Sequence, residues 1–399
     1  MRVLMVAPHI HRDATGEEFV AYKWAEALSE HLELTVFAFQ DEGKVALAEL
    51  LPNARVVTTP RPRWATKLGR LEAMAKPSYP VWAARLKRWL KHELRQGVQY
   101  DVAHQIMPQA PRYVSPLRGF GIPYILGPYG GLLETPEGFA AECATAKWYT
   151  RFRVLDQWRL NWDPFLRRSI SEAQLILGVA PYVAQSLASV PLCRFETVLE
   201  LGVENVPALP DRAPTGQLTL LHVGRGVRTK GLRDVVRAMG YLKDVPGLHL
   251  ISAGEGEEIP ICKQEAERLA VSDRIEFLGQ LPRNKIEDLY KSSDIFVFPS
   301  FREPAGNVVY EAMSWGLPVI AVARGGPDSI VDETTGLKVA VSTPDAMARD
   351  VAAAIRTLVE NSDLRRELGA GGRQKLLREG LWPTKARHML KIYESVSGA

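Results

Sequence analysis

The sequence has 399 residues and a mass of 44.4 kDa. A chain of this length is usually too long for a single hydrophobic core, so we expect two or three domains. Apolar residues make up 46% and charged residues 24% of the chain, a balance that excludes a fully disordered protein. The net charge is +4, and no apolar run approaches the roughly 18 residues that a membrane-spanning helix needs. With no signal-peptide pattern at its start, the sequence predicts a cytoplasmic protein.

The first half alternates short apolar runs with helical patterns. Expected strands cover residues 2–7, 34–39, 102–105, 123–126 and 174–179. A turn at Gly16 leads into an expected helix over residues 17–29. The cysteines, Cys143, Cys193 and Cys262, lie far apart in the sequence, which fits neither a zinc site nor a disulfide framework, and we expect all three to be buried thiols.

The second half repeats this organisation after a proline-spaced stretch, residues 205–217, that is typical of a linker. Expected strands cover residues 218–223, 249–253, 274–278, 295–298 and 318–321. Helices are expected over residues 233–242 and, with a proline at its start, over residues 382–397.

Unbroken apolar strands that alternate with helices predict parallel sheets covered on both faces. We therefore expect an α/β protein with two doubly wound, Rossmann-like domains, residues 1–205 and 218–380, which face each other across a cleft. We expect residues 381–399 to form a helix that packs back on the first domain. Ligands of such sheets bind at the carboxyl ends of the strands.

Neither half carries the glycine pattern of a dinucleotide site. The turn Gly224-Arg225-Gly226 has Thr229 in place of the third glycine, and Gly254-Glu255-Gly256 has Ile259. A phosphate-binding Walker loop is absent as well. The sequence therefore argues against hydride transfer.

The segment 299–316 carries two carboxylates after an expected strand. Glu303 falls in a polar loop, a helix is expected from about Asn307, and Glu311 lies roughly one helical turn deeper. The first amides of this helix, at Gly306, Asn307 and Val308, suit anionic or hydroxyl-rich ligands. This pattern is typical of a sugar and ribose site, although a surface Glu303 and an ordinary helical Glu311 would give the same spacing.

A second cluster follows the expected strand 218–223. Arg225 and Lys230 flank glycines there, and two fixed cations beside glycine amides can hold a pyrophosphate and stabilise its charge as it leaves. Taken singly, each of them is more often a solvated surface residue.

Together these motifs resemble the retaining glycosyltransferases of family 4, which have the GT-B fold. The similarity runs in order and at matching spacing over nearly all of residues 218–395. It is carried by Gly224-Arg225, Lys230-Gly231, Phe277-Leu278-Gly279, Pro299-Ser300, Glu303, Glu311-Ala312-Met313, Gly316, Pro318-Val319 and Gly325-Gly326.

The first half resembles the family less closely. Gly16 is followed by Glu17, so only half of the family's double-glycine turn is present. Residues 101–104 match a D-V-x-H strand whose histidine lies near the sugar, so the resemblance gives His104 a catalytic role. Without the resemblance, His104 would be a satisfied core histidine. Ala305 also departs from the family's usual Phe or Ser and leaves the sugar unassigned.

The resemblance implies a role for each matching residue. Glu303 would contact the donor sugar, Glu311 the ribose, and Arg225 and Lys230 the diphosphate of a nucleotide sugar. Residues from Gly279 to Leu281 would line the base pocket, and Gly16 would approach the donor phosphate. The first domain would bind the acceptor and the second the donor. Because fixed cations can replace a metal and the sequence has no D-x-D motif, we expect no metal and no cofactor.

A strongly basic segment lies between residues 61 and 95. It carries ten Lys or Arg against two Glu, and residues 81–95 form an amphipathic helical pattern. One interpretation is a surface helix whose apolar stripe joins the core. The other is a patch that binds an anionic acceptor or anionic lipid headgroups at the inner face of the plasma membrane, as similar segments do in several relatives. That patch comprises Arg61, Arg63, Trp64, Lys67, Arg85, Arg88 and Lys91.

We therefore expect a retaining glycosyltransferase that moves a sugar from a nucleotide-diphosphate sugar to an acceptor hydroxyl. The acceptor would be a sugar or a lipid-linked molecule, in the synthesis of a cell-surface glycan, a glycolipid or a glycosylated small molecule. The alternatives are a sugar-nucleotide hydrolase or epimerase of the same fold, and a non-catalytic nucleotide-sugar-binding protein. No nucleic-acid partner is expected, because the net charge is small and no recognition motif is present.

Overall fold

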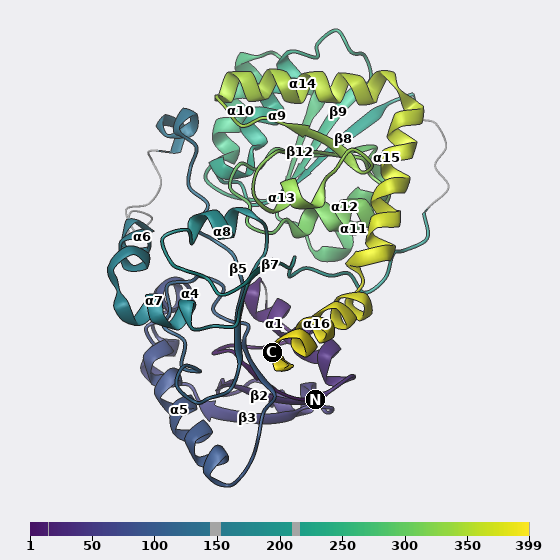
Figure 1. The fold of residues 1–399 in the computed structure, drawn as a ribbon. Helices are drawn as coiled ribbons and strands as arrows, with labels where there is room; N and C mark the ends of the chain where they lie inside the picture. The colour runs from purple at the N-terminus through teal and green to yellow at the C-terminus, as the bar shows by residue number, and fades with distance from the viewer. Residues whose placement is uncertain (15, 144–152, 210–215, 399) are drawn as a thin grey trace. The chain divides into compact units, whose positions relative to one another are not determined.

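A computed structural model describes residues 1–14, 16–143, 153–209 and 216–398 of the chain, without the side chains of residues 70, 73, 74 and 153–155 (Figure 1). Its contacts divide the chain into two compact units. Unit 1 comprises Met1–Leu132, Arg151–Glu200 and Trp382–Ala399, and unit 2 comprises Leu133–Thr150 and Leu201–Leu381. Each unit is built on its own parallel β-sheet, and each is described here by itself.

Within the described residues, the sheet of unit 1 has the strand order β3-β2-β1-β4-β5-β6-β7, and every neighbouring pair is parallel. The strands are β1 (Arg2–Val6), β2 (Glu33–Gln40), β3 (Arg55–Pro60), β4 (Val102–Gln105), β5 (Tyr124–Tyr129), β6 (Leu175–Gly178) and β7 (Phe195–Thr197). The order reverses direction between β1 and β4, which makes the sheet doubly wound.

The sheet of unit 2 has the order β10-β9-β8-β11-β12-β13 over the described residues, again with all pairs parallel. The strands are β8 (Leu218–Val223), β9 (Leu248–Ala253), β10 (Ile275–Gly279), β11 (Ile295–Phe298), β12 (Val319–Val322) and β13 (Gly336–Val339). The reversal between β8 and β11 places the loops that follow these two strands beside each other at the carboxyl edge.

Helices cover the sheets of both units. Those of unit 1 are α1 (Glu17–Ser29), α2 (Leu47–Leu50), α3 (Arg63–Thr66), α4 (Arg70–Ala75), α5 (Tyr79–Arg95), α6 (Arg153–Trp162), α7 (Pro164–Ser171), α8 (Tyr182–Ser186) and α16 (Trp382–Ser397). Those of unit 2 are α9 (Leu232–Gly240), α10 (Ile259–Arg268), α11 (Arg283–Ser292), α12 (Asn307–Ser314), α13 (Gly325–Ile330), α14 (Pro344–Glu360) and α15 (Ser362–Lys375). Short 3₁₀ turns at Glu137–Phe139, Ala141–Cys143, Arg228–Lys230 and Ser272–Arg274 and a π-helical turn at Leu376–Gly380 complete the order.

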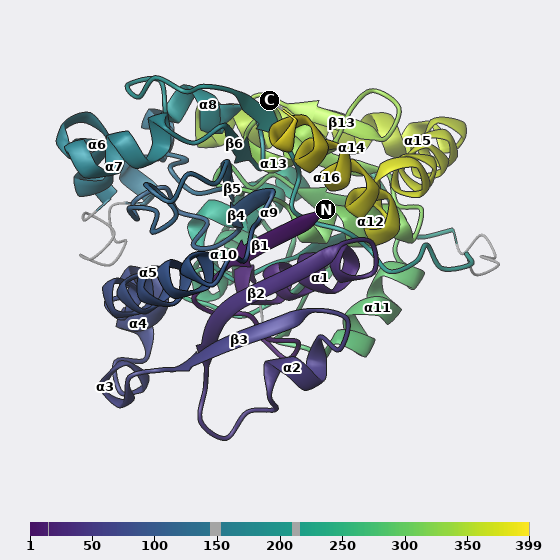
Figure 2. The same ribbon diagram turned by 60° about the horizontal axis from the view of Figure 1, so that its bottom comes forward.

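The two faces of the unit 1 sheet are covered by different helices. Successive strand residues point to opposite faces, and in β4 Ala103 belongs to the core cluster that holds α5, α6 and α7, whereas His104 contacts α16. Helices α5, α6 and α7 therefore form one layer, and α16 lies on the opposite face. Figures 1 and 2 both show α5, α6 and α7 along the same side of unit 1.

The C-terminal helix α16 belongs to unit 1 although it follows unit 2 in the chain. Its Trp382 ring meets Trp24 of α1 edge-on, with 5.5 Å between the ring centroids. Lys385 Nζ donates a hydrogen bond to the Leu199 carbonyl at 2.7 Å. These contacts fasten α16 to α1 and to the segment that follows β7.

The predicted α/β fold with parallel sheets is confirmed, and the expected strands and helices occur within a few residues of their predicted bounds. The sequence analysis missed β3, β7 and β13, which lie at or next to the sheet edges. Edge strands are partly exposed, and β3 has no fully buried residue, so they lack the continuous apolar run by which the central strands were found.

Two further expectations differ from the structure. The segment from Leu133 to Cys143, which the sequence analysis placed in the first domain, belongs to unit 2, because the Phe139 ring packs on Phe301 with 4.3 Å between centroids. Cys193 is exposed and Cys143 half-buried, so only Cys262 is the buried thiol expected of all three. Of the expected linker, residues 210–215 lie outside the described residues. Among the described residues, no helix is long and apolar enough to cross a membrane.

Candidate functional site

The centre of the candidate site is an ion pair at the carboxyl edge of the unit 2 sheet. Lys230 comes from the turn between β8 and α9, and Glu303 from the loop between β11 and α12. Lys230 Nζ contacts Glu303 Oε2, and the two side chains are only 13% and 14% exposed. The structure therefore brings together two predicted site residues that are 73 positions apart in the sequence.

Two glycines fix this ion pair by allowing close backbone approaches. At Gly231, φ is 79°, and a Cβ atom would lie 2.3 Å from the carbonyl oxygen of Pro299. At Gly325, φ is 70°, and a Cβ atom would lie 2.3 Å from the carbonyl oxygen of Glu303. That same carbonyl accepts a hydrogen bond from the Gly326 amide at 3.0 Å. Glycine is required because both the positive φ and the missing Cβ are needed.

The start of helix α12 lies in the same loop. Gly306 takes φ 100° at the N-cap position and provides no side-chain cap. The first amides of a helix have no intrahelical partner, so those of Asn307 and Val308 face the loop in which Glu303 lies. Glu303 Oε1 also accepts a long hydrogen bond of 3.4 Å from the Ala305 amide.

The second predicted carboxylate, Glu311, lies inside α12 and is largely buried. Burial raises the pKa of its carboxyl group. The Tyr290 hydroxyl, on α11, donates to Glu311 Oε2 at 3.1 Å and also lies 3.3 Å from the Val308 carbonyl. Tyr290 orients Glu311, and the sequence analysis missed it because α11 carried no motif.

The remaining predicted donor residues lie on loops that follow strands of the same sheet. Arg225 follows β8 and is exposed, and in the part of the chain that the structure describes it has no ion pair. Gly279 ends β10 with φ 67°, and its carbonyl accepts a hydrogen bond from the Gly254 amide at 2.8 Å. Leu281 follows it half-buried. Among the described residues, no hydrogen bond or ion pair joins these residues to the pair of Lys230 and Glu303.

Arg228, which the sequence analysis did not single out, is the buried cation of the same turn. Its guanidinium holds Asp234 in two hydrogen bonds of 2.6 and 2.8 Å and lies 5.1 Å from the centroid of the Phe139 ring. It also bonds Glu142 at 2.7 Å. Asp234 is fully buried, and burial raises the pKa of its carboxyl group to about 6. This network fastens the segment before residue 144 to the turn that presents Lys230.

His104, predicted as catalytic by resemblance, lies in unit 1 and is completely buried. Its Nε2 lies 2.6 Å from the Gly127 carbonyl, to which it donates, so Nδ1 accepts from the Tyr393 hydroxyl at 2.7 Å. Burial lowers the pKa of the ring to about 4. With both nitrogens engaged and no exposed edge, the ring has nothing to offer a ligand. In this structure His104 is therefore a hydrogen-bonded core histidine, and the catalytic role implied by the resemblance stays a prediction.

Gly16, the other predicted donor residue of unit 1, is the N-cap of α1 with φ 67°. No atom lies within 4 Å of the position that its Cβ would take. The positive φ alone therefore favours glycine there.

The predicted basic patch divides into two groups. Arg61 and Arg85 turn toward the protein, since Arg61 pairs with Asp41 at 3.2 Å and Arg85 bonds the Thr59 hydroxyl at 3.1 Å. The others are exposed, namely Arg63, Trp64, Lys67, Arg88 and Lys91. Trp82, Leu86 and Leu90 of α5 are fully buried, so the apolar stripe of this helix joins the core as the first interpretation expected.

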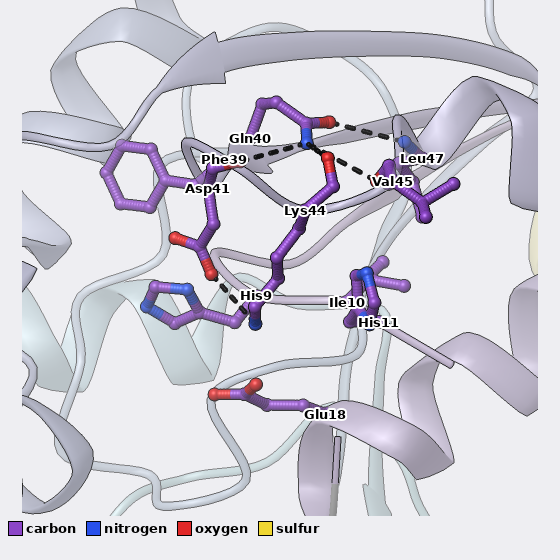
Figure 3. Close-up of a pocket in the computed structure, with 10 residues that line it drawn as sticks. All are labelled: His9, Ile10, His11, Glu18, Phe39, Gln40, Asp41, Lys44, Val45 and Leu47. Carbon is purple, nitrogen blue, oxygen red and sulfur yellow. Dashed lines mark hydrogen bonds and ion pairs between the residues drawn. The ribbon is translucent and has the colours of Figure 1, made fainter. Parts of the chain in front are cut away.

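A polar pocket lies at the carboxyl edge of the unit 1 sheet (Figure 3). His9 follows β1, Asp41 follows β2, and Lys44 Nζ lies 3.0 Å from Asp41 Oδ2. Burial raises the pKa of Glu18 and lowers that of His9 to about 3. Figure 3 shows Asp41 and Lys44 pointing toward each other beside His9. The sequence analysis missed these residues, and their only signal was their place directly after β1 and β2.

The comparison with solved structures identifies the fold. The structure resembles sucrose-phosphate synthase from Thermosynechococcus elongatus with a TM-score of 0.68 and 20% identity, covering 100% of this chain and 99% of that one. It also resembles Anabaena Alr3699/HepE in complex with UDP, with a TM-score of 0.67 and 15% identity over 99% and 100% of the two chains. These likenesses show the GT-B fold.

The sequence comparison finds similarity in the second half of the chain. Residues 210–375, which carry the Lys230–Glu303 pair, match the family described as "Glycosyl transferases group 1". Alpha-maltose-1-phosphate synthase from Mycolicibacterium smegmatis is 32% identical over 189 residues, 44% of this chain and 47% of that protein. Glycogen synthase from Mycobacterium tuberculosis is 30% identical over 201 residues, 49% and 48% of the two chains. The chain spans about half the length of the curated relatives it matches.

The buried Arg228–Asp234 pair predicts a large loss of stability in Arg228→Met. Removing one partner leaves a buried charge uncompensated, and we expect the free energy of unfolding to fall by about 3–5 kcal/mol. Urea unfolding followed by circular dichroism measures the change. Arg225→Met, in the same turn but exposed, is the matched control and should change stability by less than about 0.5 kcal/mol. Equal stability of the two variants would contradict this account.

The environment of His104 predicts a pH dependence of stability. Its pKa is about 4 in the folded protein against an ordinary value of 6.5, so the unfolded chain binds a proton first as the pH falls. The free energy of unfolding should therefore decrease from pH 7 to pH 4, with at most about 3 kcal/mol from His104.

His9 and His222 are also buried with lowered pKa values. The contribution of His104 to the pH dependence of stability must therefore be measured separately. His104→Gln can still donate to the Gly127 carbonyl but does not titrate. Its unfolding free energy should depend less steeply on pH between 7 and 4 than that of the unmodified protein. Parallel pH curves for the two proteins would show that folding does not lower the pKa of His104.

Proposed function

We propose that the chain is a retaining glycosyltransferase of family 4 that transfers a sugar from a nucleotide-diphosphate sugar to a hydroxyl group of a carbohydrate or lipid-linked acceptor. The observation that carries this proposal is the Lys230–Glu303 pair, held at the carboxyl edge of a doubly wound sheet inside the segment that matches the glycosyltransferase family. Two of the similar structures hold UDP and UDP-glucose, which supports a nucleotide-sugar donor.

Lys230 binds the donor diphosphate in this proposal. In the donor-free protein its ammonium group is neutralised by Glu303, which keeps a mostly buried cation in place. The exposed Arg225 closes on the diphosphate from the solvent side, and the amides that begin α12 face the same charge. Glu303 then contacts the sugar hydroxyls, while Glu311, oriented by Tyr290, accepts hydrogen bonds from the ribose.

Transfer breaks the bond between the anomeric carbon and the diphosphate oxygen and forms a bond from that carbon to the acceptor oxygen on the same face. The acceptor proton passes to the departing diphosphate. Negative charge grows on the leaving oxygen in the transition state. A preorganised cation beside that oxygen therefore stabilises the transition state more than the bound donor. Lys230 supplies this cation, so the proposed reaction proceeds without a metal ion.

Two alternatives remain open to experiment. A hydrolase or epimerase of the same fold would turn over the donor without an acceptor, and a nucleotide-sugar-binding protein would bind the donor without turnover. The Lys230–Glu303 pair favours transfer over simple binding, because binding alone needs no buried carboxylate beside the phosphate-binding cation. Dependence of donor turnover on an added acceptor separates the three.

Glu303→Gln and Lys230→Ala should each lower the rate of donor turnover by about 100- to 1,000-fold. The Gln variant loses the charge that places Lys230, and the Ala variant loses the cation that stabilises the leaving group. Release of nucleoside diphosphate in the presence of acceptor measures the rate. Lys243→Ala, an exposed lysine of unit 2, is the matched control. Full turnover by Glu303→Gln would disprove the site assignment.

Nucleoside diphosphates should stabilise the protein in a base-dependent manner. Ligands that bind only the folded form raise the melting temperature, by an amount that corresponds to about 2.7 kcal/mol at 100 times Kd. A panel of UDP, GDP, ADP and dTDP, with magnesium or with a chelator, measures both selectivity and metal dependence. We expect UDP to give the largest shift, and the shift to survive the chelator. A shift that requires magnesium would disprove the metal-free mechanism.

A further inference from the structure

A buried histidine lies beneath the turn that presents Lys230. His222 is the last residue but one of β8 and is only 1% exposed. Its Nε2 lies 3.1 Å from the carbonyl oxygen of Lys230. Because a carbonyl oxygen can only accept, Nε2 carries the hydrogen and donates the bond. The His222 ring therefore bonds the backbone of the residue whose ammonium group contacts Glu303.

This hydrogen bond is what a histidine adds at this position. Among the described residues, Nδ1 of His222 is buried and has no hydrogen-bond partner. A buried nitrogen without a partner costs free energy, which an apolar side chain of similar size would avoid. Burial also lowers the pKa of the ring to about 4, so His222 is neutral at neutral pH and places no second positive charge beside Lys230. The bond to the Lys230 carbonyl therefore offsets the cost of burying an imidazole.

The neighbouring carbonyl of the same turn is held in the same way. Ser300, which follows β11 and is fully buried, donates from its hydroxyl to the Thr229 carbonyl at 2.9 Å. Residues Arg228–Lys230 form one 3₁₀ turn, so side chains from the ends of two adjacent strands hold two successive carbonyls of it. A peptide group of this turn can rotate only if one of these bonds breaks. The backbone of Lys230 is thereby fixed relative to the sheet.

Phe298 links the His222 ring to the other end of the lysine. It is the last residue of β11, and its ring centroid lies 5.8 Å from that of His222. The ammonium nitrogen of Lys230 lies 5.6 Å from the same centroid, within the range of a cation–π contact. The three side chains surround Gly224, where a Cβ atom would lie within 4 Å of each of them. His222 and Phe298 thus form one packed support beneath Lys230.

We propose that His222 is a positioning residue, which places the Lys230 ammonium group by holding the Lys230 carbonyl. Lys230 stabilises the diphosphate in the proposed function, on which this inference rests. Lysine carries its charge on a flexible four-carbon chain, and in the donor-free protein Glu303 holds the charged end. When Glu303 contacts the sugar hydroxyls instead, the backbone anchor at His222 remains. Since a displacement of about 1 Å can lower a rate about 100-fold, this anchor matters most in the complex with the donor.

His222 acts through Lys230 and does not itself touch the ligand, because it is almost completely buried. A purely structural role predicts a loss of stability and an equal weakening of every ligand of the site. A positioning role predicts a loss confined to ligands that carry the diphosphate. Uridine and UDP, which differ only in the diphosphate, therefore separate the two roles.

Binding of UDP and of uridine to the full chain is the test. His222→Phe keeps an aromatic ring against Phe298 but has no donor for the Lys230 carbonyl. Its Kd for UDP, measured by isothermal titration calorimetry, should rise about tenfold, because hydrogen bonds to charged groups are strong. Its Kd for uridine, measured by ligand-observed NMR, should change less than about twofold, because uridine has no group that Lys230 would bind.

His222→Gln is the conservative variant, since its amide nitrogen can donate to the same carbonyl. Its Kd for UDP should lie within about threefold of that of the unmodified protein, because the lost bond is replaced. Ser300→Ala releases the adjacent Thr229 carbonyl and should weaken the binding of UDP but not of uridine, as His222→Phe does. This variant provides the same comparison if His222→Phe does not fold.

Thr335→Val is the matched control. Thr335 is fully buried in unit 2 directly before β13, and its hydroxyl donates to the Asp332 carbonyl at 3.3 Å. Because all strands are parallel, it lies at the amino edge of the sheet, opposite the turn. The control loses a buried hydrogen bond without touching the turn, so its Kd for UDP should be unchanged. Equal weakening of UDP and uridine binding by His222→Phe, or failure of His222→Gln to restore UDP binding, would overturn the proposal.

A crystal structure of His222→Phe separates this proposal from the proposed function. If the unmodified protein binds neither UDP nor uridine, the proposed function fails, and the position of Lys230 in the variant is then the deciding observation. A shifted Lys230 backbone would support the anchoring by His222, and an unchanged turn would overturn it.

Discussion

The candidate site depends on one constraint, which is that every strand of each sheet runs in the same direction. All carboxyl ends then lie along one edge, and residues distant in the sequence meet in the loops that follow adjacent strands. Lys230 follows β8 and Glu303 follows β11, and these strands are neighbours. The close approaches at Gly231 and Gly325 turn this proximity into a defined contact between a cation and a carboxylate.

The central strands and the lining of the site could be predicted from the sequence. Strands such as β8 and β11 are apolar along most of their length because helices cover both faces of the sheet. Glu303, Lys230 and Glu311 were found from motif spacing, although the contact between the first two required the observed strand order. The match of residues 210–375 to the glycosyltransferase family model agrees with that motif spacing.

The burial of Arg228 and His104 could not be predicted, because it depends on side chains that distant segments of the chain bring into contact with them. Arg225 and Arg228 are close together in one turn and look alike in the sequence, yet only Arg228 is buried, since Asp234, Glu142 and Phe139 surround it. His104 matched a motif, but its two nitrogens are occupied by Gly127 and Tyr393, the latter 289 residues away. Burial of this kind follows from tertiary packing and has no local signal.

The position of α16 has a consequence for biosynthesis. Domains often fold in order as the chain leaves the ribosome, but unit 1 receives Trp382 and Tyr393 only after all of unit 2 has been translated. Until then the Trp24 face of α1 and the ring of His104 lack their partners. A nascent unit 1 therefore leaves the apolar Trp24 face of α1 uncovered while the rest of unit 2 is translated.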